Sequence, residues 1–241
     1  MSETIMGVKS PKAYAHFAGF NYLLIFILAI FANFFVLSKL MVSGDAAATA
    51  ANIAANESQY RLAIAAFFIV LVCDVFIAWS LYLILKKTDP NLSLLAALFR
   101  LTYTVAQIGV LLNLVNALEF VGVAETPGAL AAISQAAWPY YFLTAHNTGF
   151  TLTLIFFGLH LLLLGHLIVR SSFLPSLIGI LVMVAGTGYI IDGFDEILGL
   201  GYGGIPNAGL YVVILPALLG EGALMLWLLI RGLNREKWLA A

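Results

Sequence analysis

The chain has 241 residues, of which 63% are hydrophobic and only 10% are charged. A soluble domain carries about 45–50% apolar and about 25% charged residues, so much of the surface of this protein must face lipid rather than water. The formal net charge of -1 provides no basic excess for nucleic acid, and the single cysteine, Cys73, excludes an intramolecular disulfide.

Six apolar stretches predict membrane-spanning helices, because about 20 apolar residues cross a hydrocarbon core about 30 Å thick. In chain order they are Tyr14–Val36, Leu62–Leu85, Leu94–Phe120, Phe142–Ile168, Leu174–Ile197 and Leu210–Ile230. After the first stretch, Asp45 is placed to cap a short alanine-rich helix over Ala46–Ala55. The sequence therefore predicts an all-α integral membrane bundle of six transmembrane helices, with residues 1–241 forming a single multi-pass domain.

Lysine and arginine residues are divided unevenly between the two ends of these helices. One end carries Lys39 and Arg61. The other end carries eight basic residues, namely Lys9, Lys12, Lys86, Lys87, Arg170, Arg231, Arg235 and Lys237. Because basic residues favour the cytoplasmic side of a membrane, we expect both termini to be cytoplasmic.

Small residues recur every seven positions along the fourth and fifth spans. They are Thr151, Gly158 and Gly165 in the fourth span and Gly179, Gly186 and Gly193 in the fifth. Seven residues are nearly two helical turns, so each set forms one stripe along its helix. Small residues allow close approach between helices in lipid, and a short loop joins the two spans. We therefore predict that they pack together through these stripes.

Ionisable side chains inside a membrane are costly and mark functional sites by default. At about 1.5 Å per residue from the cytoplasmic helix ends, Arg100, His160 and Glu221 lie roughly 10–14 Å deep, with Asp74 a few ångströms deeper. Tyr103 and Gln107 share a helix face with Arg100. The candidate binding residues of this buried polar layer are Asp74, Arg100, Tyr103, Gln107, His160 and Glu221.

Two residues of other types bear on the same layer. Pro216 lies five residues before Glu221, and a proline inside a helix removes a hydrogen bond and clashes with the preceding turn. We therefore predict a kink beside Glu221. Asn21 on the first span is also placed to reach the layer.

Three interpretations of the layer stay open. In the first, Asp74 or Glu221 pairs with Arg100, a neutral His160 hydrogen-bonds beside them, and the network is purely structural. In the second, the layer lines a polar pocket, where two acids against one arginine favour a protonated carboxyl, a cation or a basic ligand. In the third, His160 joins an acid at a metal ion, but the chain has no His-Glu-x-x-His motif and we expect no metal site.

Several segments, in order along nearly the whole chain, resemble a known family. They are Ser38-Lys39-Leu40, Gly44-Asp45 with Thr49 and Asn52-Ile53, Phe99-Arg100-Leu101, Phe156-Phe157-Gly158-Leu159-His160, Gly165, Leu167-Ile168-Val169-Arg170-Ser171, Pro175, Gly186-Thr187-Gly188-Tyr189 with Asp192, Glu221, and Trp227-Leu228-Leu229. The chain resembles the prokaryotic membrane-protein family named domain of unknown function 4386. The resemblance implies a multi-pass protein of the bacterial or archaeal plasma (inner) membrane and implies no activity. Asp74 lies outside the matching segments.

Three functions follow from these observations. We expect the protein to bind or move a small molecule or lipid through the buried polar layer. The first alternative is an intramembrane enzyme acting on a lipid or isoprenoid, with Glu221, His160 or Asp74 as acid, base or ligand. The second is a structural or regulatory partner of another membrane protein. Membrane lipids are the expected partners, and the sequence identifies no cofactor and no protein partner.

Overall fold

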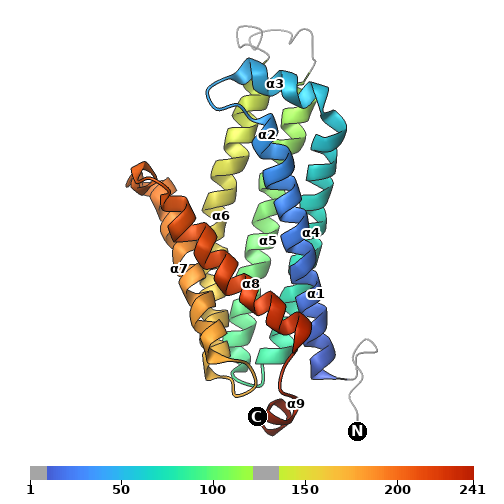
Figure 1. Ribbon diagram of the computed structural model, residues 1–241, viewed down its shortest axis with the longest axis vertical. Coiled ribbons are helices and arrows are strands. Elements are labelled where there is room, and N and C mark those ends of the chain that lie inside the picture. Colours follow the sequence, from blue (N-terminus) through green and yellow to red (C-terminus); the bar gives the residue numbers. More distant parts are fainter. Residues whose placement is uncertain (1–9, 122–135) are drawn as a thin grey trace. The chain divides into compact units, whose positions relative to one another are not determined.

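The computed structural model describes residues 10–121 and 136–241, and within these ranges every regular element is a helix. Six helices are long and apolar enough to cross a membrane, as the sequence predicts. The first span, Pro11–Leu40, consists of α1 (Pro11–Ile30), η1 (Phe31–Leu37) and α2 (Ser38–Leu40). The next four are α4 (Glu57–Leu85), α5 (Pro90–Glu119), α6 (Ala137–Arg170) and α7 (Ser176–Leu198). The last span, Leu210–Ile230, consists of η4 (Leu210–Ile214) and α8 (Leu215–Ile230). Figure 1 shows the six spans in chain order from blue to red.

Several of these helices are longer than a membrane requires. The α6 helix has 34 residues. At about 1.5 Å per residue this is a length of about 51 Å, against a hydrocarbon core about 30 Å thick. The helix begins at Ala137, five residues before the predicted start, because its first turn consists of polar and aromatic residues that an apolar pattern does not detect.

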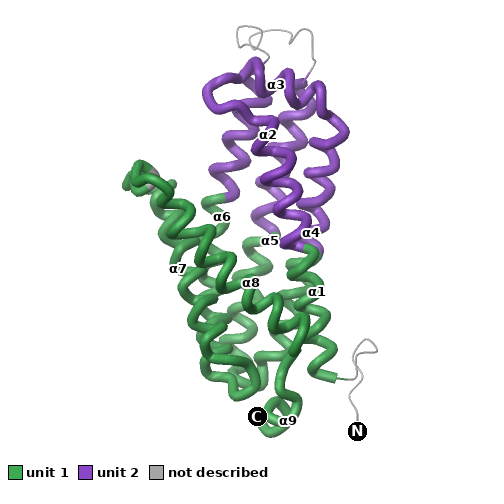
Figure 2. The backbone as a smooth tube through the Cα atoms, viewed as in Figure 1, with its two compact units in different colours: residues 1–24, 73–104, 151–241 green, residues 25–72, 105–150 purple. Residues whose placement is uncertain are grey.

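The chain divides into two compact units, shown in Figure 2. Unit 1 comprises Met1–Leu24, Cys73–Thr104 and Thr151–Ala241, and unit 2 comprises Ile25–Val72 and Val105–Phe150. The helices α1, α4, α5 and α6 therefore contribute residues to both units. Each unit is described separately below.

In unit 1, α6 and α7 pack through their glycine stripes, as predicted. A Cβ atom added to Gly158 would lie 2.6 Å from the carbonyl oxygen of Gly186, and one added to Gly186 would lie 2.7 Å from the carbonyl oxygen of Gly158. Gly165 and Gly179 contact each other's backbone in the same way, and Gly193 lies against Thr151 and Ile155. Any larger side chain at these positions would force the two helix backbones apart.

The last span packs beside α7, as Figure 1 shows. Gly220 of α8 approaches the Leu181 carbonyl of α7 so closely that an added Cβ would lie 2.6 Å from its oxygen. Gly188 of α7 faces the carbonyl oxygen of Val212.

A π-helical segment, η4, ends at Ile214, two residues before Pro216, and α8 continues from Leu215 through Glu221. The kink beside Glu221 stays a prediction. Proline has no backbone N–H, so Pro216 cannot donate the helical hydrogen bond that the Val212 carbonyl would otherwise accept. An irregular helical segment at this position is consistent with that missing bond.

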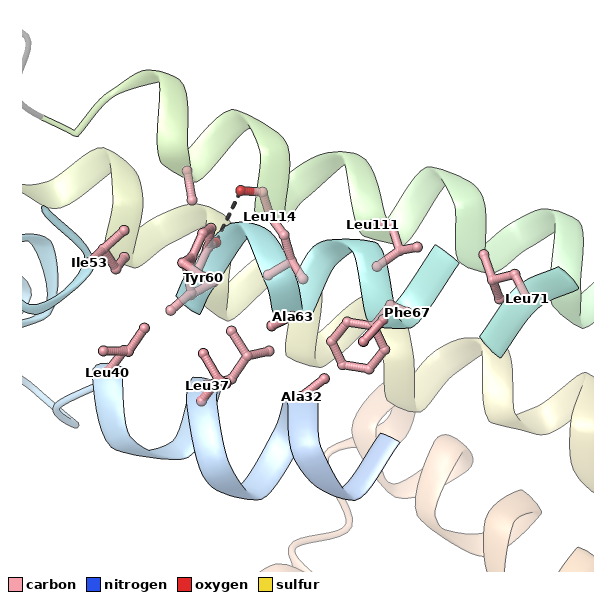
Figure 3. Close-up of a cluster of buried hydrophobic side chains, with 14 residues drawn as sticks. Ala32, Leu37, Leu40, Ile53, Tyr60, Ala63, Phe67, Leu71, Leu111 and Leu114 are labelled. Atoms are coloured by element: carbon pink, nitrogen blue, oxygen red, sulfur yellow. Dashed lines mark hydrogen bonds between the residues drawn. The ribbon is translucent and has the colours of Figure 1, made fainter. Parts of the chain in front are cut away.

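Unit 2 contains an apolar core formed by α1 with its continuation, α3 (Ala46–Ala55), α4, α5 and α6. Figure 3 shows Leu37, Ile53, Phe67 and other buried side chains of this cluster. Its tyrosine, Tyr60, donates its hydroxyl hydrogen to the backbone carbonyl of Leu114 at 3.0 Å. The predicted helix over Ala46–Ala55 is confirmed, and the Asp45 carboxylate accepts a hydrogen bond from the Ala48 N–H at 2.8 Å.

Candidate functional site

Arg100 of α5 lies at the centre of the polar layer, in unit 1, and is 1% exposed. Its Nε and Nη2 atoms donate hydrogen bonds to Oδ1 of Asp74 on α4, at 2.9 and 2.5 Å. The two residues form an ion pair in which both side chains are buried. The prediction that an acid pairs with Arg100 is confirmed, and the acid is Asp74. Two opposite charges held this closely offset much of the cost of removing each from water.

The remaining terminal nitrogen of Arg100 contacts two further helices. Nη1 donates to the hydroxyl of Tyr22 on α1 at 2.8 Å and lies 3.2 Å from Nε2 of His160 on α6. Because a guanidinium only donates hydrogen bonds, Nε2 of His160 must be the acceptor. Nδ1 of His160 then carries the hydrogen and donates it to the Ala96 carbonyl, 2.8 Å away.

These two contacts determine the protonation state and the tautomer of His160. An imidazole that accepts from Arg100 and donates to Ala96 is neutral, and its tautomer is fixed. Both ring nitrogens are engaged, so His160 could take up a proton only by giving up its bond to Arg100. The contact pattern therefore favours a positioning role for His160 over the acid or base role of the enzyme alternative.

Aromatic rings cover the faces of the guanidinium. The Cζ atom of Arg100 lies 5.0 Å from the ring centre of Tyr22 and 5.1 Å from that of Phe157. Ring faces attract a cation, most strongly where water is excluded. Asp74, Tyr22, His160 and Phe157 therefore surround the Arg100 guanidinium.

Glu221 of α8 has a different environment. It is 8% exposed, and its Oε1 accepts a hydrogen bond from the hydroxyl of Tyr189 on α7 at 2.8 Å. Among the residues that the structure describes, no lysine or arginine forms an ion pair with it, and Arg100 acts on it only at longer range. The close approach of Gly220 to Leu181 holds this part of α8 against α7.

The other two candidate residues are placed differently. Tyr103 is 8% exposed, and its ring lies 4.8 Å from that of Phe157, so it belongs to the Arg100 cluster. Gln107 is 3% exposed but belongs to unit 2. Within unit 1, the structure therefore brings together five of the six candidates.

Three residues of this site, Tyr22, Phe157 and Tyr189, were not predicted from the sequence. Asn21 was expected at the layer, but its amide donates to the Phe17 carbonyl in its own helix at 2.8 Å, and the neighbouring Tyr22 reaches Arg100 instead. Phe157 links the two parts of the site, because its ring lies 5.6 Å from that of Tyr189. Phe157 and Tyr189 lie within the segments on which the family resemblance rests, which is the one signal that pointed to them.

A small cavity lies beside this cluster, towards the turn between α4 and α5. A cavity of about 10 Å³ is lined by His160, Ser93, Ala96 and neighbouring apolar side chains. A cavity of this size holds about one water molecule. In the described ranges no three His, Cys, Asp or Glu side chains are grouped so as to hold a metal ion.

Comparison with known proteins identifies a family and gives no activity. An uncharacterized protein of Archaeoglobus fulgidus is 30% identical over 169 residues, which cover 70% of this chain and 83% of that protein. No solved structure matches the chain. The model of the family described as Domain of unknown function (DUF4386) matches residues 17–232, so the chain belongs to that family.

Proposed function

We propose that this multi-pass membrane protein binds or moves a small molecule or lipid through the buried polar layer, and that Glu221 holds the ligand by a cationic or basic group. The observation that carries the proposal is the difference between the two buried acids. Asp74 is neutralised by Arg100, whose other contacts are to Tyr22 and His160. Glu221 is held by the neutral hydroxyl of Tyr189.

The energetics of buried charge support this assignment. An ionised carboxylate in a membrane span is expensive unless a cation accompanies it. A bound cation, a protonated amine or a proton would each neutralise the Glu221 carboxylate. Arg100 forms its ion pair with Asp74 instead. The aromatic rings of Tyr189 and Phe157 nearby suit the recognition of an organic cation.

The test is native mass spectrometry of the protein purified in mild detergent or native nanodiscs, with elemental analysis of the same sample. We expect a retained ligand in the natural protein that is lost in Glu221→Gln, which keeps the shape of the side chain and removes its charge. Glu57→Gln is the matched control, because it removes the same charge from an exposed position. Equal retention in both variants, or none in the natural protein, would contradict the proposal.

A structural or regulatory role beside another membrane protein is the second candidate. The observation that favours it is the hydrogen-bond network around Arg100, in which both His160 nitrogens are engaged. Such a network fixes how helices pack and requires no ligand. Co-purification of one stoichiometric partner from native membranes, with no small ligand in the mass spectrum, would support this candidate over the first.

We further propose that the protein lies in the prokaryotic plasma membrane with both termini in the cytoplasm. The supporting observation is the excess of lysine and arginine at the helix ends beside the termini, of which Lys9 lies outside the described residues. In a Cys73→Ala background, Ser43→Cys and Ser10→Cys place single thiols at opposite ends. An impermeant maleimide added to intact cells should label the first and not the second, and the reverse pattern would overturn the orientation.

A further inference from the structure

The C-terminal segment of the chain turns back onto the ends of the spans in unit 1. The backbone N–H groups of Arg231 and Gly232 both donate to the Trp227 carbonyl, and Gly232 adopts a left-handed conformation with φ of 69°. This cap ends α8, and a short helix, α9 (Arg235–Ala240), follows. Asn234 starts α9 by accepting a hydrogen bond from the Lys237 N–H at 3.1 Å.

Two long-range contacts fix this helix in place. Nε1 of Trp238 donates to the Ile84 carbonyl at the end of α4, at 2.9 Å. The N–H of Asn234 donates to the Phe173 carbonyl in the loop between α6 and α7, at 3.2 Å. Figure 1 shows α9 beside the ends of these helices. The tail is therefore docked onto the end of α4 and the loop between α6 and α7 rather than extending freely from the last span.

Docking α9 gathers basic side chains around one tryptophan. The Nζ atom of Lys87 lies 5.1 Å from the ring centre of Trp238, and Arg235 and Lys237 are exposed on α9 itself. Four further exposed basic side chains lie at the same helix ends, namely Lys12, Lys86, Arg170 and Arg231.

Few acids oppose this charge. The described acids at these helix ends are Asp89 and Glu236. Asp89 accepts hydrogen bonds from the backbone of Asn91 and Leu92 and lies 3.8 Å from Arg170, so its charge is already engaged. The basic character of the surface around Trp238 is therefore largely uncompensated.

We propose that this surface, formed by Lys87, Arg235, Lys237 and Trp238, binds the phosphate of an anionic phospholipid headgroup. Three features favour a lipid as the occupant. The surface directly follows the end of a membrane span, so it lies at the level of headgroups. Trp238 is the type of side chain that sits at a membrane interface, and Leu239 beside it is 58% exposed. Basic residues next to a span are attracted to anionic lipids.

Two basic residues of unit 2, Lys39 of α2 and Arg61 near the start of α4, provide the contrast. Arg61 pairs with Glu57 at 2.7 Å, and Lys39 lies over the ring of Phe35 as Lys87 lies over that of Trp238. Lys39 and Arg61 therefore supply a control with the same loss of charge.

The experiment measures melting temperature and retained lipid for the full chain in detergent, with phosphatidylglycerol or phosphatidylcholine added. Phosphatidylglycerol should raise the melting temperature of the natural protein more than phosphatidylcholine does. The double variant Arg235→Gln with Lys237→Gln should need about 25-fold more phosphatidylglycerol for the same rise in melting temperature, since each basic residue near an anionic surface contributes about a fivefold effect. Lys39→Gln with Arg61→Gln should respond like the natural protein.

Three results would overturn the proposal. An equal response of both double variants would show that the effect is general electrostatics. An equal response to the two lipids would show that the headgroup charge is not recognised. Inorganic phosphate stabilising the protein as well as phosphatidylglycerol does would identify a site for free anions instead. All four substituted side chains are exposed, so the variants should fold.

Discussion

The helices α4 and α5 contribute to the interiors of both units, and the two interiors differ in polarity. In unit 1, α4 and α5 contribute Asp74 and Arg100 to a buried ion pair. In unit 2, the same helices contribute Tyr60 and Leu114 to an apolar core, where the hydroxyl of Tyr60 finds a backbone carbonyl. The comparison shows that a membrane helix can change from charged to apolar packing within a few turns, provided that its buried charges are paired.

The largest expected effect comes from breaking the ion pair. Arg100→Met should lower the free energy of unfolding by about 3–5 kcal/mol, because it leaves the Asp74 carboxylate buried without its cation. Adding Asp74→Asn should restore most of the loss, since neither position of the former pair then carries a charge. Denaturant unfolding in detergent measures both. Additive losses in the double variant would show that the two side chains do not act as a pair.

A smaller effect is expected from separating α6 and α7. Gly158→Val should cost about 1–3 kcal/mol, because its Cβ would meet the Gly186 backbone, which cannot move aside as a side chain does. Gly109 of α5 is the control, because an added Cβ there meets nothing within 4 Å. Gly109→Ala should instead stabilise the helix by up to about 1 kcal/mol. Thermal melting in one detergent compares the two, and equal losses would contradict the packing argument.

In unit 2, the polar contact is weaker because it involves no charge. Tyr60→Phe should cost about 1 kcal/mol, the usual net value of a neutral hydrogen bond. The substitution keeps the ring in the apolar core and removes only the hydroxyl. A loss comparable to that of Arg100→Met in the same unfolding assay would show that the two regions do not differ in the proposed way.

The smallest expected effect is local. Asp45→Ala removes the cap of α3 and should destabilise that helix by about 1 kcal/mol. Hydrogen exchange should accelerate at the Ala48 N–H, which loses its acceptor, while amides around Arg100 remain unchanged. Faster exchange in both units would indicate that the cap supports more than its own helix.

The sequence alone predicted the elements that depend on local patterns. An apolar run of sufficient length must become a helix in lipid, because every backbone polar group must be satisfied within the chain. The six spans, the helix capped by Asp45 and the glycine contact of α6 with α7 therefore needed only residue order and spacing. Helix ends shifted by several residues, as at Ala137, because polar and aromatic residues can extend a helix beyond the hydrocarbon core.

Only the tertiary structure decided which polar groups meet. Two acids were candidates for Arg100, and the choice of Asp74 depended on how α4 and α5 rotate against each other. Tyr22 and Tyr189 were not predicted, because their hydroxyls contact residues 78 and 32 positions away in sequence. Sequence spacing gives the depth of a side chain in a span, whereas its partner depends on helix rotation and tilt, which packing against neighbouring helices sets.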